Sequence, residues 1–316
     1  MKVLLKHSLK TAMKKCNICE KIVRSDALFC PNCGSNNLEE IAEVKRYSKL
    51  GSLIKAILCA VVFIAVQYVV TFAFVVIDSI RCSIGTELSP EELETLLMDH
   101  LSSSTVIIGI ISNIAVIALF AVYFLIRRKS LCAEFGMRKI PPLIAPLCAL
   151  FGYAMQYALG FITVLIPWPE EWLALHSEST SSVVSGSLIL VIIGTSVVTG
   201  FAEETVFRVL SMERLGRAWG GGVCVIVSAV VFGIAHLSPV AVFYATILGG
   251  ILGCLYRKFR SVWPCAIVHM AFNLASVIGL PDDSLLLYFS VTAVSIGISI
   301  ISAYLIFSAI EAKEEQ

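Results

Sequence analysis

Charged residues are scarce in this 316-residue chain, at 15% of the total. A soluble domain has about a quarter of its residues charged, so the composition argues against a single soluble domain. The net charge of +1 provides no bulk argument for nucleic acid, and we expect no nucleic-acid partner. Apolar residues make up 58% of the chain and fall in blocks long enough to cross a bilayer.

Eight apolar blocks predict an all-α, polytopic membrane protein with about eight transmembrane helices. They are Ala56–Ile77, Thr105–Ile126, Leu143–Ile166, Val183–Phe201, Val223–Leu237, Val240–Tyr256, Val262–Leu280 and Leu285–Ile310. We expect no cleavable signal peptide, because the first 50 residues are polar and lysine-rich without an apolar run. No internal repeat is evident.

The distribution of cationic residues predicts the orientation of the chain. With a cytosolic N-terminus and an even number of spans, all but Arg81 of the 24 Lys and Arg residues fall on the inner side. The outer loops are acidic instead. The positive-inside rule therefore predicts a multi-pass protein of the cell membrane with both termini in the cytosol. Membrane lipids are its first expected partner, and the oligomeric state has no signature in the sequence.

The chain lacks the regular cysteine spacing of a disulfide scaffold, since most of its 11 cysteines are scattered through apolar segments. The exceptions are two CxxC pairs, Cys16 with Cys19 and Cys30 with Cys33. Two such turns place four thiolates around one zinc ion, which supplies folding energy that a short knuckle cannot obtain from a core. A redox role is disfavoured because the doubled motif has no βαβ unit. We predict a cytosolic zinc ribbon with its core at residues 16–34, acting either as a stable cap or in substrate recruitment.

Three polar motifs interrupt the apolar segments. They are Gly200-Phe-Ala-Glu203-Glu204-Thr-Val-Phe-Arg208, Phe232-Gly-Ile-Ala-His236 and His269-Met-Ala-Phe-Asn273. An ionisable group inside a span costs about 2.5–3.5 kcal/mol on insertion scales, so function is its default explanation. A single motif of this kind could equally be a structural lock between helices.

Helical spacing assigns partners within the motifs. Glu204 and Arg208 are four residues apart, an arrangement that favours an ion pair. Glu203 points about 100° away from Glu204 and has no cation of its own, so it is the better candidate for a working base. His269 and Asn273 are also four residues apart and are expected to face one cavity. An imidazole and an amide are suitable donors to a developing oxyanion.

The motifs EExxxR, FxxxH and HxxxN, in this order, resemble those of the CPBP intramembrane proteases. That family includes the type II CAAX prenyl endopeptidases and the bacteriocin-immunity (Abi) proteins. The resemblance covers about residues 140–280. It implies an α-helical membrane fold, a site in a cavity within the bilayer, and a peptide or protein substrate in the membrane.

The resemblance also implies roles for individual residues. Glu203 and His236 correspond to the pair that activates a water, and His269 and Asn273 to the pair that stabilises the oxyanion. Glu204 and Arg208 occupy the remaining motif positions. The expected catalytic set is therefore Glu203, Glu204, Arg208, His236, His269 and Asn273.

Two mechanisms remain open for such a site. The chain has no HExxH motif and is therefore not a zincin. A glutamate with two histidines could still hold a catalytic zinc, as the label metalloprotease, often applied to this family, implies. A glutamate-activated water without a metal is the alternative that we favour.

These observations predict an intramembrane endopeptidase that acts on a CAAX-type or bacteriocin-like substrate. A non-proteolytic scaffold or immunity protein is one alternative. A proton-coupled transporter is a weaker one, because the sequence shows no convincing inverted repeats. The expected organisation is a zinc ribbon and linker (1–50), N-terminal transmembrane helices (51–140), a CPBP-like catalytic core (141–280), and a last helix with a cytosolic tail (281–316).

Overall fold

The computed structural model describes most of the chain. The described residues are 13–17, 22–24, 27–30, 35–41, 48–84, 88–183, 186–279 and 285–308. Helices dominate these residues, and the predicted all-α membrane class is confirmed. The strands form one antiparallel sheet in the order β2-β1-β3, made by β1 (Met13–Cys16), β2 (Ile22–Arg24) and β3 (Leu38–Ile41).

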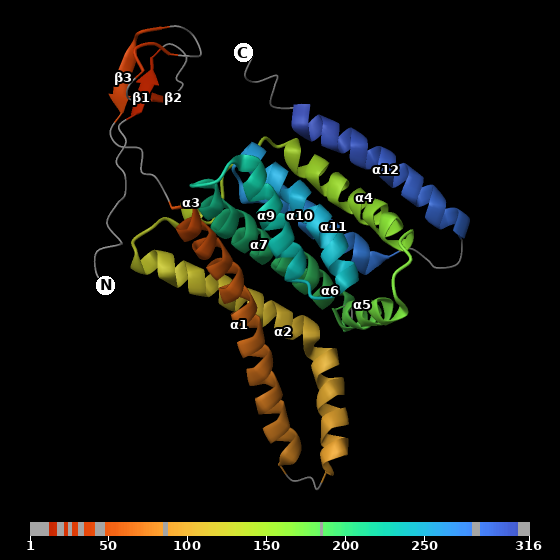
Figure 1. Cartoon of the computed structure of the whole chain (residues 1–316). Helices are drawn as coiled ribbons and strands as arrows, with labels where there is room; N and C mark the ends of the chain where they lie inside the picture. The colour runs from red at the N-terminus through yellow and green to blue at the C-terminus, as the bar shows by residue number, and fades with distance from the viewer. Residues whose placement is uncertain are drawn as a thin grey trace.

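The helices follow one another with short connections (Figure 1). In chain order they are α1 (Lys49–Ser83), α2 (Pro90–Ile126), α3 (Leu131–Glu134), α4 (Ile144–Val164), α5 (Glu170–Val183), α6 (Leu188–Val191), η1 (Ile192–Val198), α7 (Thr199–Glu204), η2 (Thr205–Met212), α8 (Glu213–Gly216), α9 (Gly221–Ile234), α10 (Pro239–Phe259), α11 (Val262–Ile278) and α12 (Leu285–Ser308). The segments η1 and η2 are π-helical, and the stretch from α6 to α8 is continuous.

Six of the described helices are long and apolar enough to cross a membrane: α1, α2, α4, Leu188–Gly216, α10 and α12. The other two predicted blocks are helical but shorter, with 14 residues in α9 and 17 in α11. At 1.5 Å per residue they reach about 21 and 26 Å, less than the roughly 30 Å of a hydrocarbon core. Within the described residues each of the eight apolar blocks therefore contains a helix, and eight is an approximate count of spans.

The first two helices form a hairpin whose far ends project away from the other helices (Figure 1). Helix α2 begins with a capping box, in which Ser89 Oγ accepts from the Glu92 backbone and Glu92 Oε2 accepts from the Ser89 backbone. At the opposite end, Trp219 Nε1 donates to the Lys49 carbonyl over 3.2 Å. The start of α1 is thereby tied to the turn between α8 and α9.

Two glycines allow α11 to approach its neighbours closely. A Cβ on Gly152 of α4 would lie 2.1 Å from the Val268 carbonyl oxygen, so the two backbones are in direct contact. A Cβ on Gly200 of α7 would lie 3.2 Å from the Met270 backbone nitrogen. Because Val268 and Met270 flank His269, these contacts fix the position of that histidine along the bundle.

The small sheet encloses two of the four motif cysteines. Cys16 and Cys30 are both buried and form one cluster with Val23, against which Ala27 and Leu38 pack. Cys19 and Cys33 lie outside the described residues. The two cysteines that are described thus lie together, as a shared metal site requires.

Candidate active site within the helical bundle

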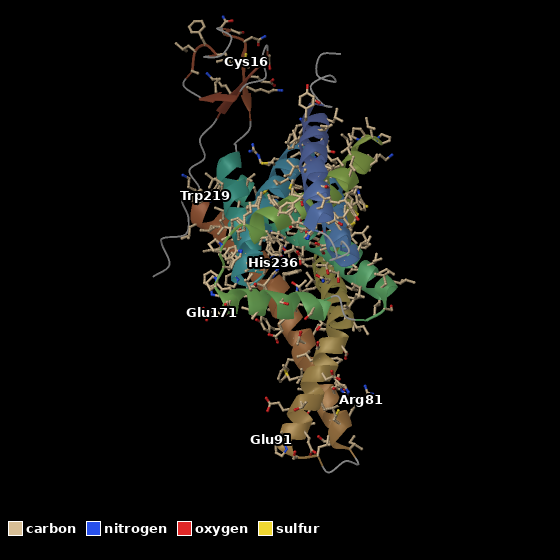
Figure 2. The ribbon with its side chains drawn as sticks, turned by 90° about the vertical axis from the view of Figure 1, so that its right-hand side faces the viewer. Cys16, Arg81, Glu91, Glu171, Trp219 and His236 are labelled. Atoms are coloured by element: carbon tan, nitrogen blue, oxygen red, sulfur yellow. The ribbon has the colours of Figure 1, made fainter. Side chains whose placement is uncertain are left out.

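A cavity of about 580 Å³ lies among α4, α5, α7, α10 and α11. Its walls are largely apolar, with Leu159, Trp168, Leu248 and Phe272 among the lining side chains. Four of the six expected site residues also line it: Glu203, His236, His269 and Asn273. Figure 2 shows His236 inside the bundle, at a level between Trp219 and Glu171. The structure therefore brings side chains from three separate motifs to one internal space.

Glu203 is the carboxylate that faces this cavity. Its side chain is 13% exposed, and Oε2 is buried without a hydrogen-bond donor among the described residues. The ring of His269 lies close to it, with Nε2 3.9 Å from Oε2. That separation is too long for a hydrogen bond. Glu203 is thus available to a water or a substrate group.

Glu204 does not line the cavity and is buried inside the protein. Glu204 and Arg208 are both fully buried. Arg208 donates from Nε to Glu204 Oε2 over 2.8 Å and from Nη2 to Glu204 Oε1 over 3.3 Å. Arg208 also contacts Ser228 Oγ over 3.3 Å, and its guanidinium lies 4.5 Å from the centre of the Phe232 ring. The predicted ion pair is confirmed, and its many partners satisfy two charges that would be very costly if buried alone.

His269 connects the two glutamates. Its Nδ1 lies 3.1 Å from Glu204 Oε1. The Arg208 partner keeps that carboxylate ionised, and an ionised carboxylate only accepts, so Nδ1 is the donor. Nε2 then faces Glu203 and the cavity. The buried ion pair therefore sets the tautomer and direction of His269.

His236 lies in the turn after α9, where Leu237 closes the helix with a left-handed backbone, φ 61°. The Nδ1 atom lies 2.9 Å from the Phe232 carbonyl oxygen. Since a carbonyl only accepts, Nδ1 carries the hydrogen, and Nε2 of the neutral ring is a free acceptor. The rings of His236 and His269 both contact Phe232 edge-on, at 4.8 and 5.7 Å between centroids. Phe232 thus holds both imidazoles on the same part of the bundle.

Asn273 depends on the π-helical segment η1. Its amide Nδ2 donates to the Thr195 carbonyl over 2.9 Å, which leaves the second amide hydrogen for another acceptor. At the start of α7, Thr199 Oγ1 donates to the Gly194 carbonyl of η1 over 2.9 Å and accepts from Asn113 Nδ2 over 3.1 Å. Single π-helical turns occur often at functional sites, because the wider winding presents carbonyls to side chains.

The amphipathic helix α5 covers one side of the cavity. His176 lines the space and packs edge-on against Tyr244, with 5.8 Å between ring centroids. Partial burial lowers the pKa of His176 from its ordinary value of 6.5. The ring is therefore neutral at pH 7.

The positions of Glu203, His236 and His269 bear on whether they could hold a catalytic metal. A zinc site needs three or four such atoms within about 2.0–2.3 Å of one point. Among the described residues, Asp78, Cys82 and His100 are the one group of three whose ligand atoms all lie within 4.8 Å of one another. They lie outside this cavity. Glu203, His236 and His269 do not gather in this way. A catalytic zinc at these residues is therefore not supported.

Several features of the site have no signal in the sequence. The bond between His269 and Glu204 joins residues 65 positions apart, and the bond from Asn273 to Thr195 joins residues 78 apart. The sequence predicts only an acidic outer loop where α5 covers the cavity. Phe232 was part of a motif, but its contact with Arg208 depends on how η2 and α9 pack.

Comparison with known proteins gives two matches to family models. The model described as type II CAAX prenyl endopeptidase Rce1-like matches residues 185–275, and a zinc-ribbon domain model matches residues 12–37. No curated protein and no solved structure matches the chain. The first segment contains all six expected site residues, and the second contains all four motif cysteines. The chain is therefore a multi-span membrane protein with one segment similar to zinc-ribbon domains and another similar to the Rce1-like type II CAAX prenyl endopeptidases.

Proposed function

We propose that the chain hydrolyses a peptide bond presented in the cavity of the bundle. The observation that carries the proposal is the carboxylate of Glu203, whose Oε2 has no hydrogen-bond donor among the described residues and which shares one largely apolar space with two imidazoles and an amide. Hydrolysis of a peptide bond needs a base for the attacking water and donors for the developing oxyanion. These side chains provide both.

In this proposal Glu203 is the general base and His236 is its partner on the water. Water bound between them donates one hydrogen to the carboxylate and one to His236 Nε2. That nitrogen accepts because the hydrogen of the neutral ring is on Nδ1, which donates to the Phe232 carbonyl. Attack on the carbonyl carbon transfers a proton from water to Glu203. Glu203 then delivers that proton to the amine that leaves.

His269 and Asn273 stabilise the negative charge on the carbonyl oxygen. Asn273 uses the amide hydrogen that does not bond to Thr195. His269 donates from Nε2 to that oxygen in the form of the ring that carries a hydrogen on both nitrogens. Glu204 and Arg208 take no part in the proton transfers and act by positioning His269.

The walls of the cavity favour an apolar substrate segment. Its volume lies within the range of about 300–1,000 Å³ that is typical of binding sites, and most of its lining is apolar. A membrane-embedded peptide or a lipid-anchored tail fits this lining. The family description points to a CAAX-type tail, and a bacteriocin-like peptide is the second substrate class.

We propose that the ribbon binds one structural zinc through Cys16, Cys19, Cys30 and Cys33. The buried pair Cys16 and Cys30 supports this, and the matched zinc-ribbon model spans all four cysteines. Four thiolates complete a tetrahedral shell and leave no open position for catalysis. Both termini are placed in the cytosol, on the charge bias of the loops.

A structural lock is the second candidate function. The buried contacts of Glu204, Arg208 and His269 would also serve a non-proteolytic scaffold or immunity protein. Glu203 argues against that alternative. Its Oε2 has no hydrogen-bond donor among the described residues, and a buried carboxylate without a donor does not stabilise a structural contact. The same observation leaves a proton-coupled transporter as a weaker third candidate.

Substrate identification provides the test. Cells that express the wild type, Glu203→Gln or Glu171→Gln would be compared by proteomic sequencing of peptide N-termini in the membrane fraction. Glu171 is an exposed glutamate of α5 and serves as the matched control. New N-termini should appear with the wild type and Glu171→Gln and be absent with Glu203→Gln. Identical N-termini in all three, at equal amounts of folded protein, would favour the scaffold.

A further inference from the structure

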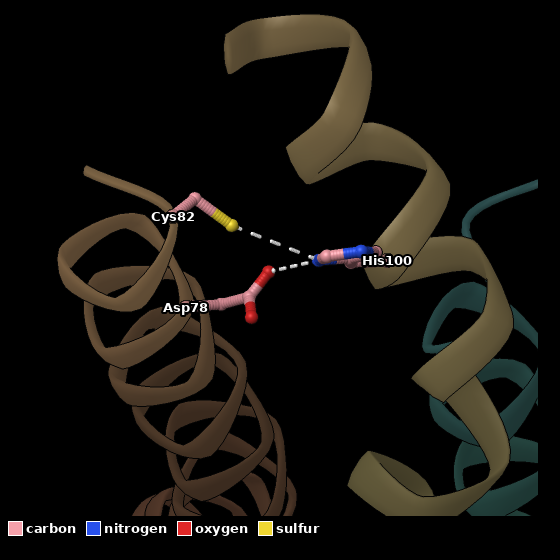
Figure 3. Close-up of side chains that lie close together, drawn as sticks. All are labelled: Asp78, Cys82 and His100. Carbon is pink, nitrogen blue, oxygen red and sulfur yellow. Dashed lines mark hydrogen bonds and ion pairs between the residues drawn. The ribbon is translucent and has the colours of Figure 1, made fainter. Parts of the chain in front are cut away.

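A second group of chemically active side chains lies at the far end of the α1–α2 hairpin (Figure 3). His100 Nδ1 of α2 is 2.7 Å from Asp78 Oδ2 and 3.9 Å from Cys82 Sγ, both on α1. The three ligand atoms lie within 4.8 Å of one another. At 1.5 Å per residue, Asp78 lies about 44 Å along α1 from Lys49. The group is therefore at the opposite end of α1 from the contact between Lys49 and Trp219.

Sequence spacing and burial make this a formed cluster. Asp78 and Cys82 are four residues apart, so both lie on the face of α1 that meets α2. The Asp78 side chain is only 10% exposed, whereas that of His100 is 40% exposed. A carboxylate on a helix this apolar is costly without a partner, and it is retained here beside two metal-ligating groups.

We propose that Asp78, Cys82 and His100 bind one zinc ion that joins α1 to α2. Carboxylate oxygen, thiolate sulfur and imidazole nitrogen are the three ligand types that zinc accepts in proteins. Their ligand atoms would lie about 3.3–3.7 Å apart around a tetrahedral ion with bonds of about 2.0–2.3 Å. The observed separations of 2.7 and 3.9 Å bracket that range. Small side-chain rotations therefore suffice to form the site.

Binding replaces the hydrogen that His100 and Asp78 share. The imidazole moves its proton to Nε2 and binds the metal through Nδ1, while the Cys82 thiol releases a proton and binds as thiolate. Three protein ligands leave a fourth position for water or for a ligand from another molecule. Because this end of the hairpin projects away from the other helices, the ion would fix a part of the chain that packing holds weakly (Figure 1). This site is independent of the proposed peptidase activity.

The test must separate this zinc from that of the ribbon. Full-length protein would carry Cys16→Ser and Cys19→Ser to disable the ribbon and be purified in detergent. After removal of metal it would be equilibrated with Zn²⁺ and assayed by elemental analysis. Co²⁺ would then replace Zn²⁺ to report a sulfur-to-metal absorption band. Cys82→Ser, His100→Ala and Asp78→Asn would be added singly, with Asp99→Asn as the control for an exposed carboxylate beside His100.

One zinc per chain should remain in the ribbon-disabled background and in Asp99→Asn. Cys82→Ser should remove the thiolate band, and His100→Ala and Asp78→Asn should each weaken zinc binding at least about tenfold. Circular dichroism would show equal helix content in all variants. The absence of bound metal in the ribbon-disabled background would overturn the proposal. So would a metal whose thiolate band survives Cys82→Ser.

Discussion

His269 donates from Nδ1 to Glu204 Oε1 over 3.1 Å, across 65 residues of sequence. The second glutamate of the EExxxR motif therefore holds both the arginine of its own motif and the histidine of another. The first glutamate, one residue earlier, faces the cavity without a donor. Adjacent carboxylates in one helix thus have opposite environments, which is the basis for assigning them different roles.

Arg208→Met is expected to unfold the bundle more readily. The change leaves the fully buried Glu204 with an uncompensated charge, and breaking a buried ion pair in this way costs about 3–5 kcal/mol. Thermal unfolding in detergent would measure the loss. Glu203→Gln should leave the midpoint nearly unchanged, because its Oε2 has no donor to lose among the described residues. Equal destabilisation by the two variants would contradict the division of roles.

Gly152→Ala is expected to separate α4 from α11 and displace His269. The added Cβ would lie 2.1 Å from the Val268 carbonyl, and overpacking of this kind costs about 1–3 kcal/mol or more. Gly160→Ala, on the same helix with nothing within 4 Å of the new Cβ, is the control and should be neutral or slightly stabilising. Thermal midpoints of the two variants would be compared with the wild type. A Gly152→Ala protein as stable as Gly160→Ala would show that the close contact is not required.

Asn273→Ala is expected to slow cleavage about 10²–10³-fold, the usual effect of losing one oxyanion donor. The variant also leaves the Thr195 carbonyl without its side-chain donor, so a modest loss of stability should accompany the change. Cleavage rates must therefore be compared at equal concentrations of folded protein. Wild-type rates under those conditions would remove Asn273 from the oxyanion site.

Acid is expected to loosen α5 from the mouth of the cavity. The folded-state pKa of His176 is lowered from 6.5, so the unfolded or detached state binds more protons as pH falls below 6.5. The stabilising contact with Tyr244 is therefore present above 6.5 and lost as pH falls through the folded pKa. Hydrogen exchange of α5 should increase between pH 7.5 and 5.5 in the wild type and change less in His176→Gln. Exchange that does not depend on pH in the wild type would contradict this account.

The sequence predicts much of this architecture because its strongest signal is hydrophobicity. Within the described residues every apolar block contains a helix, and the four-residue spacing of Glu204 and Arg208 correctly predicts their ion pair. Helix length is less well predicted in the N-terminal hairpin, since α1 and α2 extend over 35 and 37 residues, well beyond the apolar blocks Ala56–Ile77 and Thr105–Ile126. The orientation of the termini stays a prediction, because charge bias is its only support.

The site is predictable only in outline, because local spacing does not determine contacts between distant motifs. The motifs name the four residues that line the cavity, but not the bond that joins His269 to Glu204. Nor does spacing show that η1 turns the Thr195 carbonyl toward Asn273. Both contacts depend on how α11 packs against its neighbours, which the small residues Gly152 and Gly200 decide through close backbone approach.

The rate of cleavage by Glu203→Gln, relative to wild type in lipid vesicles, tests the central claim most directly. The substrate would be the membrane peptide identified by its new N-terminus, and thermal midpoints would confirm equal folding. Loss of a general base should reduce the rate by about 10²–10⁴-fold with the midpoint unchanged. Cleavage at the wild-type rate by folded Glu203→Gln protein would contradict the assignment of this carboxylate to the attacking water.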